Sequence, residues 1–292
     1  MPNGLVEQAL RKELIETFRD PTYQPPPLPS VAVKLASLAR DDDADIHDVV
    51  RLLEQDQMLA GLVLRLVSSP VYASRLPITS LRQAVVRVGL KRLRSIVFEA
   101  ALRRGIFDLP DYRETMEQVL RHSTTSAYIA RIVCARSGLD PESGFLAALL
   151  HDIGFSGLLF SVSRHQEEGG LKLERLWRDF DGAHERASNL LARLWSLPVD
   201  ICEVVGNHHH FDRCATGTAS RVAAAVCIAD ELSGRFGANI VGAVDDEGNF
   251  IAVDSVPDLT LTGARELLGV DDQRLESILE TAEEVIPDVL WV

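Results

Sequence analysis

The sequence predicts a nearly all-α protein made of two packed helical lobes and a short acidic α+β C-terminal tail. Three observations predict this fold class. Apolar residues recur at helical spacing between proline and glycine breaks, and strand signals are nearly absent before residue 235. Beyond that point the chain changes to short β-branched runs around an acidic turn. Because 46% of the residues are hydrophobic, the chain can bury a core without disulfide or metal staples.

Proline and glycine divide the chain into four segments. Five prolines from Pro21 to Pro29 form an extended connector, because proline cannot continue a helix. Pro110 and Asp111 mark the boundary between the two lobes. The expected segments are an N-terminal helix with the Pro-rich linker (1–24), an N-terminal helical lobe (25–110), a second helical lobe (111–235) and an acidic hairpin with a final helix (236–292).

Apolar stripes and capping residues place the individual helices. Ser30 suits the N-cap of the first helix of the N-terminal lobe, Pro70 ends the second, and Gly89 separates the last two. In the second lobe, Gly138 stops a long helix and Pro198 occupies a first helical position. The expected helices are 5–18, 31–39, 46–68 (as one helix or two), 80–90, 91–104, 112–137, 144–153, 171–180, 183–195, 198–208 and 220–232.

The C-terminal tail has a different pattern. Residues 240–244 and 250–253 flank the turn-forming run 245–249, which predicts a β-hairpin. A last helix is expected over 271–285. We therefore expect no sheet of more than three strands anywhere in the chain.

The net charge of −13 is concentrated in this tail. Residues 241–292 hold 13 acidic residues and 2 arginines, so the remaining chain is nearly neutral. Nucleic-acid binding is disfavoured, because such proteins are usually basic. The stretch from Arg82 to Arg104 is basic; it is either a solvated helix face or a docking patch for an acidic partner or a phosphate. We hypothesise that the acidic tail packs against or screens it.

Cysteine spacing and hydropathy predict a cytoplasmic protein without a membrane span. The four cysteines, at 134, 202, 214 and 227, form no CxxC pair, which is typical of reduced thiols. No run approaches the roughly 18 consecutive apolar residues of a membrane helix. The N-terminus has no basic region leading into an apolar run, so no signal peptide is expected.

Histidine placement is the most informative feature for function. Seven of the eight histidines lie between His122 and His210, several beside apolar helix faces. His151 and Asp152 close the apolar run that begins at Phe145, and Asp230 ends another. A buried carboxylate needs a partner or an ion. Imidazoles and carboxylates converging from several helices suit Zn²⁺, Mn²⁺ or Fe²⁺. The alternative is that these groups only tie helix ends together.

Adjacent residues such as His151 and Asp152 do not share a helix face. Both reach one metal ion if the helix ends there and the chain bends, and Gly154 permits that bend. A metal in such a site would lower the pKa of a bound water and polarise a phosphoryl oxygen.

The order of these residues resembles the H…HD…D pattern of the HD superfamily of metal-dependent phosphohydrolases. The residues that match it are His122, His151, Asp152 and Asp230. Further histidines are similar to the extra ligands of two-metal members such as the HD-GYP cyclic-di-nucleotide phosphodiesterases; they are His184, His208 and His209. The resemblance implies that all seven lie in or near one pocket.

Other segments are similar to HDOD proteins, a family of bacterial signalling modules named for an HD-related output domain. The resemblance covers about residues 25–235 and leaves the acidic tail unexplained. The segments that carry it are Leu28-Pro29-Ser30, Leu52–Leu66 with Ser68-Ser69-Pro70-Val71-Tyr72, Ile78–Leu93, Leu149-Leu150-His151-Asp152-Ile153-Gly154, Trp195-Ser196-Leu197-Pro198 and Asn207-His208-His209-His210.

Two departures from active HD-GYP enzymes argue against hydrolysis. Those enzymes have a lysine where this chain has Phe155, and several have a glutamate where it has Gln118. The GYP signature is also absent. Loss of the lysine removes a cation that would neutralise phosphate charge.

The resemblance implies a signalling output or adaptor module that binds a partner protein, with a cyclic di-nucleotide as a second candidate ligand. Robust catalysis is not expected, so no catalytic residue is assigned. The alternative is a metal-dependent phosphohydrolase acting on a cyclic nucleotide or another phosphoester. The seven ligand candidates are expected to hold one divalent ion (Fe, Mn or Zn) or none as isolated. Whether the chain forms a homodimer stays open.

Overall fold

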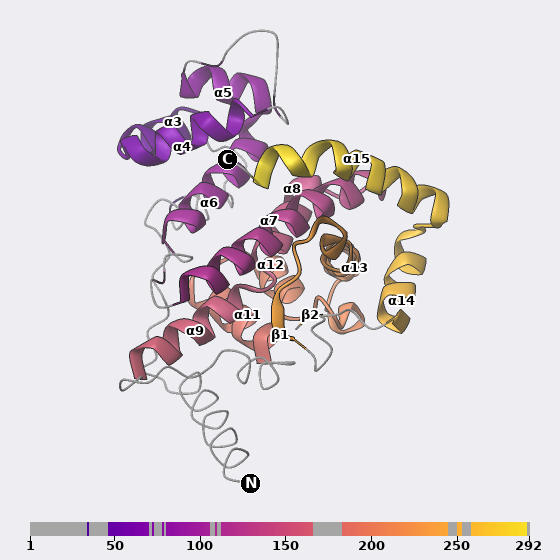
Figure 1. Cartoon of the computed structure of the whole chain (residues 1–292). Helices are drawn as coiled ribbons and strands as arrows, with labels where there is room; N and C mark the ends of the chain where they lie inside the picture. Colours follow the sequence, from indigo (N-terminus) through magenta and orange to yellow (C-terminus); the bar gives the residue numbers. More distant parts are fainter. Residues whose placement is uncertain are drawn as a thin grey trace.

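The computed structural model describes residues 34, 46–69, 72, 78, 80–105, 109, 112–165, 183–244, 250–252 and 258–290 (Figure 1). The all-α prediction is confirmed over these residues. The predicted helices 5–18 and 171–180 and the proline-rich linker lie outside them, as does helix 31–39 apart from Lys34.

The N-terminal lobe packs short helices around a small apolar core. Its helices are α3 (Ile46–Glu54), α4 (Gln57–Val67), α5 (Leu81–Val88) and α6 (Leu90–Gly105). The helical stretch 46–68, expected as one helix or two, forms two. The side chain of Asp56 caps α4, accepting a hydrogen bond from the backbone N–H of Leu59 at 3.1 Å. Gly89 ends α5 with a φ of 79°, a left-handed backbone value that favours glycine.

The second lobe is built around the long helix α7 (Arg113–Arg136), which is buried along most of its second half. Helices α8 and α13 pack against it, and α11 packs against α9 and α12. The other elements of this lobe are α8 (Pro141–Leu150), α9 (Ile153–His165), α11 (Ala183–Leu194), α12 (Val199–Val205), α13 (Gly217–Ser233) and the short turns η3 (Phe211–Arg213) and η4 (Gly234–Phe236). Asp140 and Thr216 cap α8 and α13 through their side chains.

The C-terminal segment adds a two-stranded antiparallel pair and two helices. Strand β1 (Val241–Val244) pairs with β2 (Phe250–Ala252), and no larger sheet forms among the described residues. Helix α14 (Asp258–Leu268) packs on α13, and α15 (Asp272–Leu290) packs on α7. Ile278, Ala282 and Ile286 form the buried stripe of α15 at the four-residue spacing of an amphipathic helix. Helix α14 was not expected from the sequence.

One stretch, Pro141–Phe160, is long and apolar enough to cross a membrane by length and composition alone. In the folded chain 83% of its most apolar window is buried inside the protein, as expected for a core helix.

A buried polar network joins the two lobes, which we call the lobe junction. Glu99 of α6 is fully buried and accepts hydrogen bonds from Arg103 at 2.8 Å and Tyr128 at 3.4 Å. Arg131 of α7 forms a two-pronged pair with Glu142 at 2.8 and 3.0 Å. The same guanidinium donates to the hydroxyl of Tyr72 at 3.2 Å. The junction therefore ties α6 to α7 and α8.

Cations of the basic stretch contact carboxylates of this region. Lys91 lies 3.4 Å from Asp140, and Arg92 lies 4.0 Å from Glu142. Among the described residues, the ion-pair partners of these two cations thus lie at the start of α8. The screening of this stretch by the acidic tail stays a prediction.

Candidate metal centre

Four elements of the second lobe bring the first group of site residues together. His122 lies in the middle of α7 and Asp230 lies near the end of α13. His151 and Asp152 occupy the turn between α8 and α9, so the helix expected over 144–153 ends at Leu150. This turn lets two adjacent side chains face the same centre.

Gly154 follows that turn, and its role differs from the predicted bend. Its φ is not positive, so the backbone there does not require glycine. A Cβ at this position would meet the backbone oxygen of His184 at 2.3 Å and the backbone nitrogen of Ser188 at 2.8 Å. The N–H of Gly154 also donates to the hydroxyl of Ser188 at 2.9 Å. Glycine is needed because α11 approaches here.

The side chains of the first group converge on one point. The Nε2 atom of His122 lies 3.1 Å from the Nε2 of His151, 3.1 Å from Asp230 Oδ1 and 3.3 Å from Asp152 Oδ2. The Nε2 of His151 lies 3.4 Å from Asp152 Oδ2. Two imidazole nitrogens and two carboxylate oxygens thus share a space that suits one small cation.

Backbone carbonyls set the tautomers of three histidines. The Nδ1 of His122 lies 2.8 Å from the carbonyl of Ala238, and that of His151 lies 2.6 Å from the carbonyl of Ala148. The Nδ1 of His208 is 3.0 Å from a carbonyl in the same way, that of Val205. A carbonyl only accepts, so each Nδ1 carries a proton, and in the neutral form of the ring each Nε2 would present a lone pair to the centre. Histidines that ligate metals are held in this manner.

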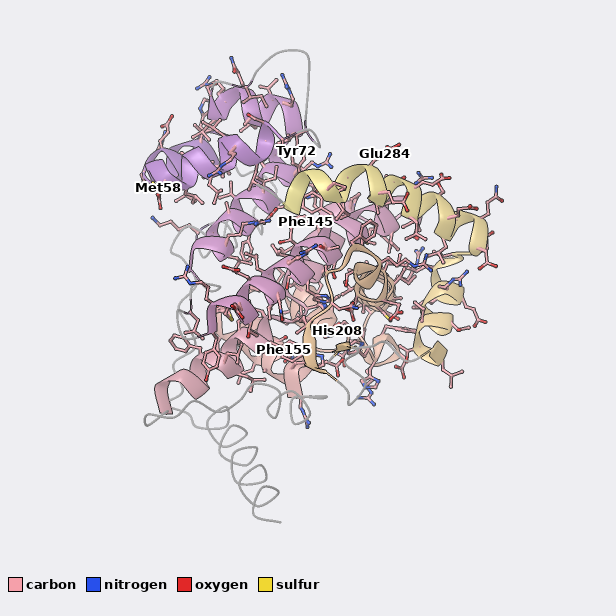
Figure 2. All side chains as sticks on the ribbon, viewed as in Figure 1. Met58, Tyr72, Phe145, Phe155, His208 and Glu284 are labelled. Atoms are coloured by element: carbon pink, nitrogen blue, oxygen red, sulfur yellow. The ribbon has the colours of Figure 1, made fainter. Side chains whose placement is uncertain are left out.

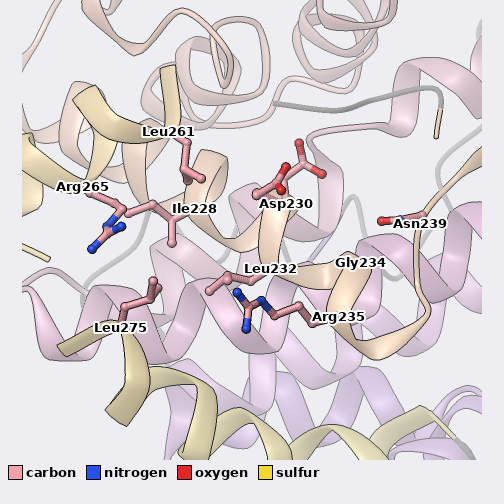
Figure 3. A pocket seen from close by; sticks show the side chains of 10 residues that line it. Ile228, Asp230, Leu232, Gly234, Arg235, Asn239, Leu261, Arg265 and Leu275 are labelled. Carbon is pink, nitrogen blue, oxygen red and sulfur yellow. The ribbon is translucent and has the colours of Figure 1, made fainter. Parts of the chain in front are cut away.

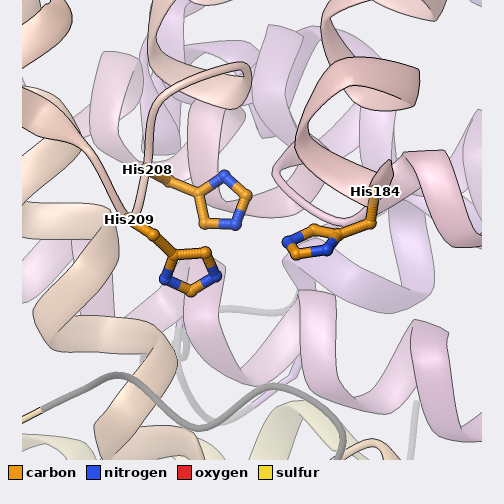
Figure 4. Close-up of side chains that lie close together, drawn as sticks. All are labelled: His184, His208 and His209. Atoms are coloured by element: carbon orange, nitrogen blue, oxygen red, sulfur yellow. The ribbon is translucent and has the colours of Figure 1, made fainter. Parts of the chain in front are cut away.

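A second group lies beside the first. His184 of α11 and His208 and His209, which follow α12, place their ring nitrogens within 4.8 Å of one another (Figure 4). Asp152 links the groups: its Oδ2 faces His122 and His151, and its Oδ1 lies 3.7 Å from His208 Nε2 and 3.8 Å from His184 Nε2. The structure thus brings together all seven residues that the sequence singled out, while their role as metal ligands stays a prediction.

Burial and mutual charge shift the pKa values of the site. Burial lowers the pKa of His122, but its interactions with Asp152 and Asp230 outweigh this and hold the pKa well above its ordinary value. Burial raises the pKa of Asp230, yet the neighbouring His122 and His151 hold it well below its ordinary value. His208 behaves oppositely, because burial and the neighbouring histidines lower its pKa well below the ordinary value. The first group therefore attracts positive charge, whether a proton or a metal ion.

Neutral histidines would leave the buried acceptors without hydrogen-bond donors. Both carboxylate oxygens of Asp152 and of Asp230, and the Nε2 of His208, have no hydrogen-bond partner among the described residues. Buried polar atoms without a hydrogen-bond partner are rare in folded proteins unless an ion or a water molecule contacts them. This chemistry fits a bound divalent cation.

The sequence did not single out Glu185, which supports the second group. This buried carboxylate accepts a hydrogen bond from the backbone N–H of His209 at 3.2 Å and lies 4.0 Å from His210 Nε2. The one feature of the sequence that could have pointed to Glu185 is its position directly after His184. Its partner is a backbone N–H, which leaves no trace in the sequence.

The two departures noted in the sequence have distinct surroundings. Phe155 is fully buried, and its ring stacks on the ring of His184 with centroids 4.9 Å apart and planes 6° apart. Gln118 lies on an exposed position of α7. Figure 2 shows Phe155 and His208 inside the second lobe, whereas Met58 and Glu284 lie on the outside. An aromatic ring therefore packs beside the second group at the position where the resemblance to HD-GYP enzymes implies a lysine.

Residues 26–211 match the family model of the HDOD domain. A solved structure of an HDOD domain protein of unknown function from Geobacter sulfurreducens is 28% identical, with a TM-score of 0.67 over 98% of this chain and 96% of that one. A candidate metal-dependent phosphohydrolase from Shewanella amazonensis SB2B is 19% identical, with a TM-score of 0.73 over 99% and 100%. A candidate signal transduction protein from Marinobacter aquaeolei VT8 is 19% identical, with a TM-score of 0.61 over 98% and 65%.

Curated relatives are longer proteins. A Thermus thermophilus protein named Ribonuclease Y is 24% identical over 258 residues, which is 76% of this chain and 40% of that protein. The chain spans about two fifths of the length of the first curated relatives that it matches.

Proposed function

Since the chain belongs to the HDOD family, we propose that it is a signalling output module in which the second lobe holds a divalent metal ion as a structural centre. In this proposal the ion orders the lobe, and the module acts by binding a partner protein. The name of the Marinobacter structure supports a signalling role, although at 19% identity the likeness itself extends only to the fold.

Deep burial of the site is the observation that carries this proposal. The side chains of His151, Asp152 and His208 are fully buried, and those of His122, His184 and Asp230 are 2% exposed. Structural metal sites are closed in this way, whereas catalytic sites keep a position open to water and substrate. The partly exposed His209 is the exception in the set.

The residues fit a divalent metal ion that accepts both nitrogen and oxygen ligands. Imidazole nitrogen with carboxylate oxygen is a donor set for Fe²⁺, Mn²⁺ or Zn²⁺. His122, His151, Asp152 and Asp230 would hold it, and His184, His208 and His209 would surround or hold a second position. When the histidines are neutral, a bound cation would supply the positive charge that balances the two carboxylates. The chain's own contribution is the fixed Nδ1 protons, which keep the Nε2 lone pairs pointed inward.

Exposed apolar side chains of the N-terminal lobe support partner binding. Met58 is 72% exposed and Val86 is 80% exposed, on the neighbouring helices α4 and α5. Arg82 and Arg87 of α5 add positive charge to the same lobe. Apolar side chains beside cations suit an acidic protein partner that also offers an apolar contact.

A metal-dependent phosphohydrolase is the second candidate. The bridging geometry of Asp152 favours it, because a carboxylate shared by two ligand groups suits a pair of metal ions that bind a phosphoester. Phe155 weighs against it, because it offers no charge to a phosphate. The substrate would be a cyclic nucleotide or another phosphoester.

Metal content and hydrolysis, measured on the same preparations, separate the two candidates. The full chain and the double variant His151→Ala with Asp152→Ala are analysed by inductively coupled plasma mass spectrometry. They are then assayed on cyclic di-GMP with added Mn²⁺. His47→Ala, an exposed histidine of α3, is the matched control.

The proposal predicts that the chain binds added Mn²⁺, that the double variant does not, and that neither hydrolyses cyclic di-GMP appreciably. The double variant should also unfold at a lower temperature than the control. Robust hydrolysis by the metal-loaded chain, abolished by the double change and kept by the control, would establish the enzyme instead.

A further inference from the structure

A cavity of about 440 Å³ lies beside the metal centre, between α13, η4, α14 and α15 (Figure 3). This volume lies within the usual range of small-molecule pockets, roughly 300–1,000 Å³. Asp230 is part of the wall, but its carboxylate is directed at His122 and His151. The function proposed above does not use this cavity.

The walls combine an apolar surface with two guanidinium groups. Ile228 and Leu232 of α13, Leu261 of α14 and Leu275 of α15 form the apolar part. Arg235 enters from η4 and Arg265 enters from α14 (Figure 3). Small-molecule sites are typically built in this way, with apolar walls and a few fixed polar groups.

The two arginines are available to an anion in different ways. Among the described ion pairs, no carboxylate pairs with Arg235, which is exposed. Arg265 is oriented by a hydrogen bond from its Nε to the carbonyl of Val270 at 3.1 Å. Its ion-pair partner, Asp272, has a side chain that is 96% exposed. Such an exposed pair contributes little, so a ligand anion can replace Asp272 at small cost.

Two further polar groups narrow the ligand class. The amide of Asn239 and the carboxylate of Glu231 also line the cavity. A carboxylate accepts hydrogen bonds only, so it favours a ligand that carries N–H or O–H groups besides its anionic group. Guanidinium groups prefer phosphate and carboxylate, and the leucines suit a flat apolar ring.

We propose that this cavity binds a nucleoside monophosphate, with the phosphate at Arg235 and Arg265 and the base against the leucines. The hydroxyl and amino groups of such a ligand would meet Glu231 and Asn239.

The wall of the cavity is also attached to the metal centre. Arg235 of η4 and Asn239 flank Ala238, whose carbonyl accepts a hydrogen bond from the Nδ1–H of His122. Asn239 packs on Gly234, where a Cβ would meet its side-chain oxygen at 2.5 Å. A ligand that contacts Arg235 and Asn239 would therefore affect the position of the carbonyl that orients His122. Binding of the nucleotide and of the metal should be coupled, and coupling of this kind is reciprocal. This coupling rests on the proposed metal centre, whereas nucleotide binding does not.

Calorimetric titration of the full chain, stripped of metal with EDTA, tests the binding. The probes are adenosine and guanosine 5′-monophosphate, with adenosine and inorganic phosphate as half-ligands. At least one monophosphate should bind with a dissociation constant below about 1 mM, and both half-ligands should bind at least about tenfold more weakly. Arg235→Ala should weaken binding by about tenfold or more, because it removes a charge-assisted contact.

Two variants control the assignment. Arg274→Ala removes an exposed cation of α15 outside the cavity and should leave binding unchanged. Leu261→Glu places a carboxylate in the apolar wall and should abolish binding. No binding by either monophosphate up to about 5 mM, or equal losses in the Arg235 and Arg274 variants, would overturn the proposal.

A Mn²⁺ titration with and without saturating monophosphate then measures the coupling. Metal affinity should change several-fold in the full chain and stay constant in Arg235→Ala. If Mn²⁺ does not bind at all, the proposed metal centre fails, while nucleotide binding is judged by the first titration alone.

Discussion

Two buried polar clusters lie along the same helix, and they differ in how far they are satisfied. At the lobe junction, both oxygens of Glu99 and of Glu142 have partners, and Arg131 donates from all three of its nitrogens. At the candidate metal centre, the carboxylate oxygens of Asp152 and Asp230 have no hydrogen-bond partner within the described part of the chain. α7 contributes Arg131 to the first cluster and His122 to the second.

We interpret this difference as that between a cluster that holds the fold together and a candidate binding site for a cation. A satisfied network needs nothing else and fixes the packing of its helices. A cluster of lone pairs and carboxylates is stable only with a cation, either protons on the histidines or a metal ion. The comparison predicts that metal stabilises the second cluster and leaves the first unaffected.

The largest change in unfolding free energy is expected from a substitution at the lobe junction. Arg131→Leu removes the two-pronged pair with Glu142 and the hydrogen bond to Tyr72. Breaking a buried ion pair costs about 3 kcal/mol of unfolding free energy. Urea denaturation should show this loss equally with and without Mn²⁺. Arg136→Leu, an exposed site on the same helix, should change stability by about 0.5 kcal/mol or less. A loss that disappears when metal is added would break the distinction between the clusters.

The double variant His151→Ala with Asp152→Ala should lose the stabilisation that metal provides. A ligand at a hundred times its dissociation constant stabilises the native state by about 2.7 kcal/mol. We expect thermal unfolding to show this gain in the full chain and none in the double variant. An equal gain in both would mean that the metal binds elsewhere.

The effect of pH should separate the metal-free and metal-bound states. Without metal, the raised pKa of His122 stabilises the fold below about pH 6.5, and this contribution is lost as the pH rises through the folded-state pKa. The lowered pKa of Asp230 stabilises the fold above about pH 3.9, and that contribution is lost on acidification through its folded-state pKa.

Protons compete with the metal for the same nitrogens, so the metal-dependent gain in unfolding temperature should grow from pH 5 to pH 8. Unfolding temperatures measured across this range, with and without Mn²⁺, give that difference directly. A gain that is constant with pH would argue that the histidines are not ligands.

The smallest effect is expected from Ser233→Ala. The hydroxyl of Ser233 lies 3.1 Å from the Nδ1 of His122 and shares that nitrogen with the carbonyl of Ala238. Because the carbonyl remains, Mn²⁺ affinity should fall by about tenfold at most. Ser220→Ala, on the same helix, should leave the affinity unchanged. Titrating both variants with Mn²⁺ tests whether the hydrogen bonds that fix the tautomer of His122 contribute to metal affinity.

The convergence of the seven site residues could be predicted because their types and order carry the information. His151-Asp152 at the end of an apolar run indicated both burial and a break in the helix. The groups that orient the histidines could not be predicted, because the carbonyls of Ala148, Val205 and Ala238 exist at every position of a chain.

The lobe junction was missed for a different reason. Glu99 and Arg131 each lie within a mainly apolar stretch of their helix, but the sequence does not show which groups they pair with. Their partners are brought to them by the packing of α6 and α7 on α8. The sequence left open whether 46–68 forms one helix or two, and Asp56, a favoured N-cap residue, could have identified the point of division. The role of Gly154 depends on the approach of α11, which no local pattern records.

The central claim is that the cluster of His122, His151, Asp152 and Asp230 is a cation site. A Mn²⁺ titration of the EDTA-treated chain, followed by the thermal unfolding temperature, tests it most directly. We expect a saturable rise of this temperature in the full chain and in Arg131→Leu, and no rise in the double variant of His151 and Asp152. An unfolding temperature of the full chain that does not change with metal would contradict it.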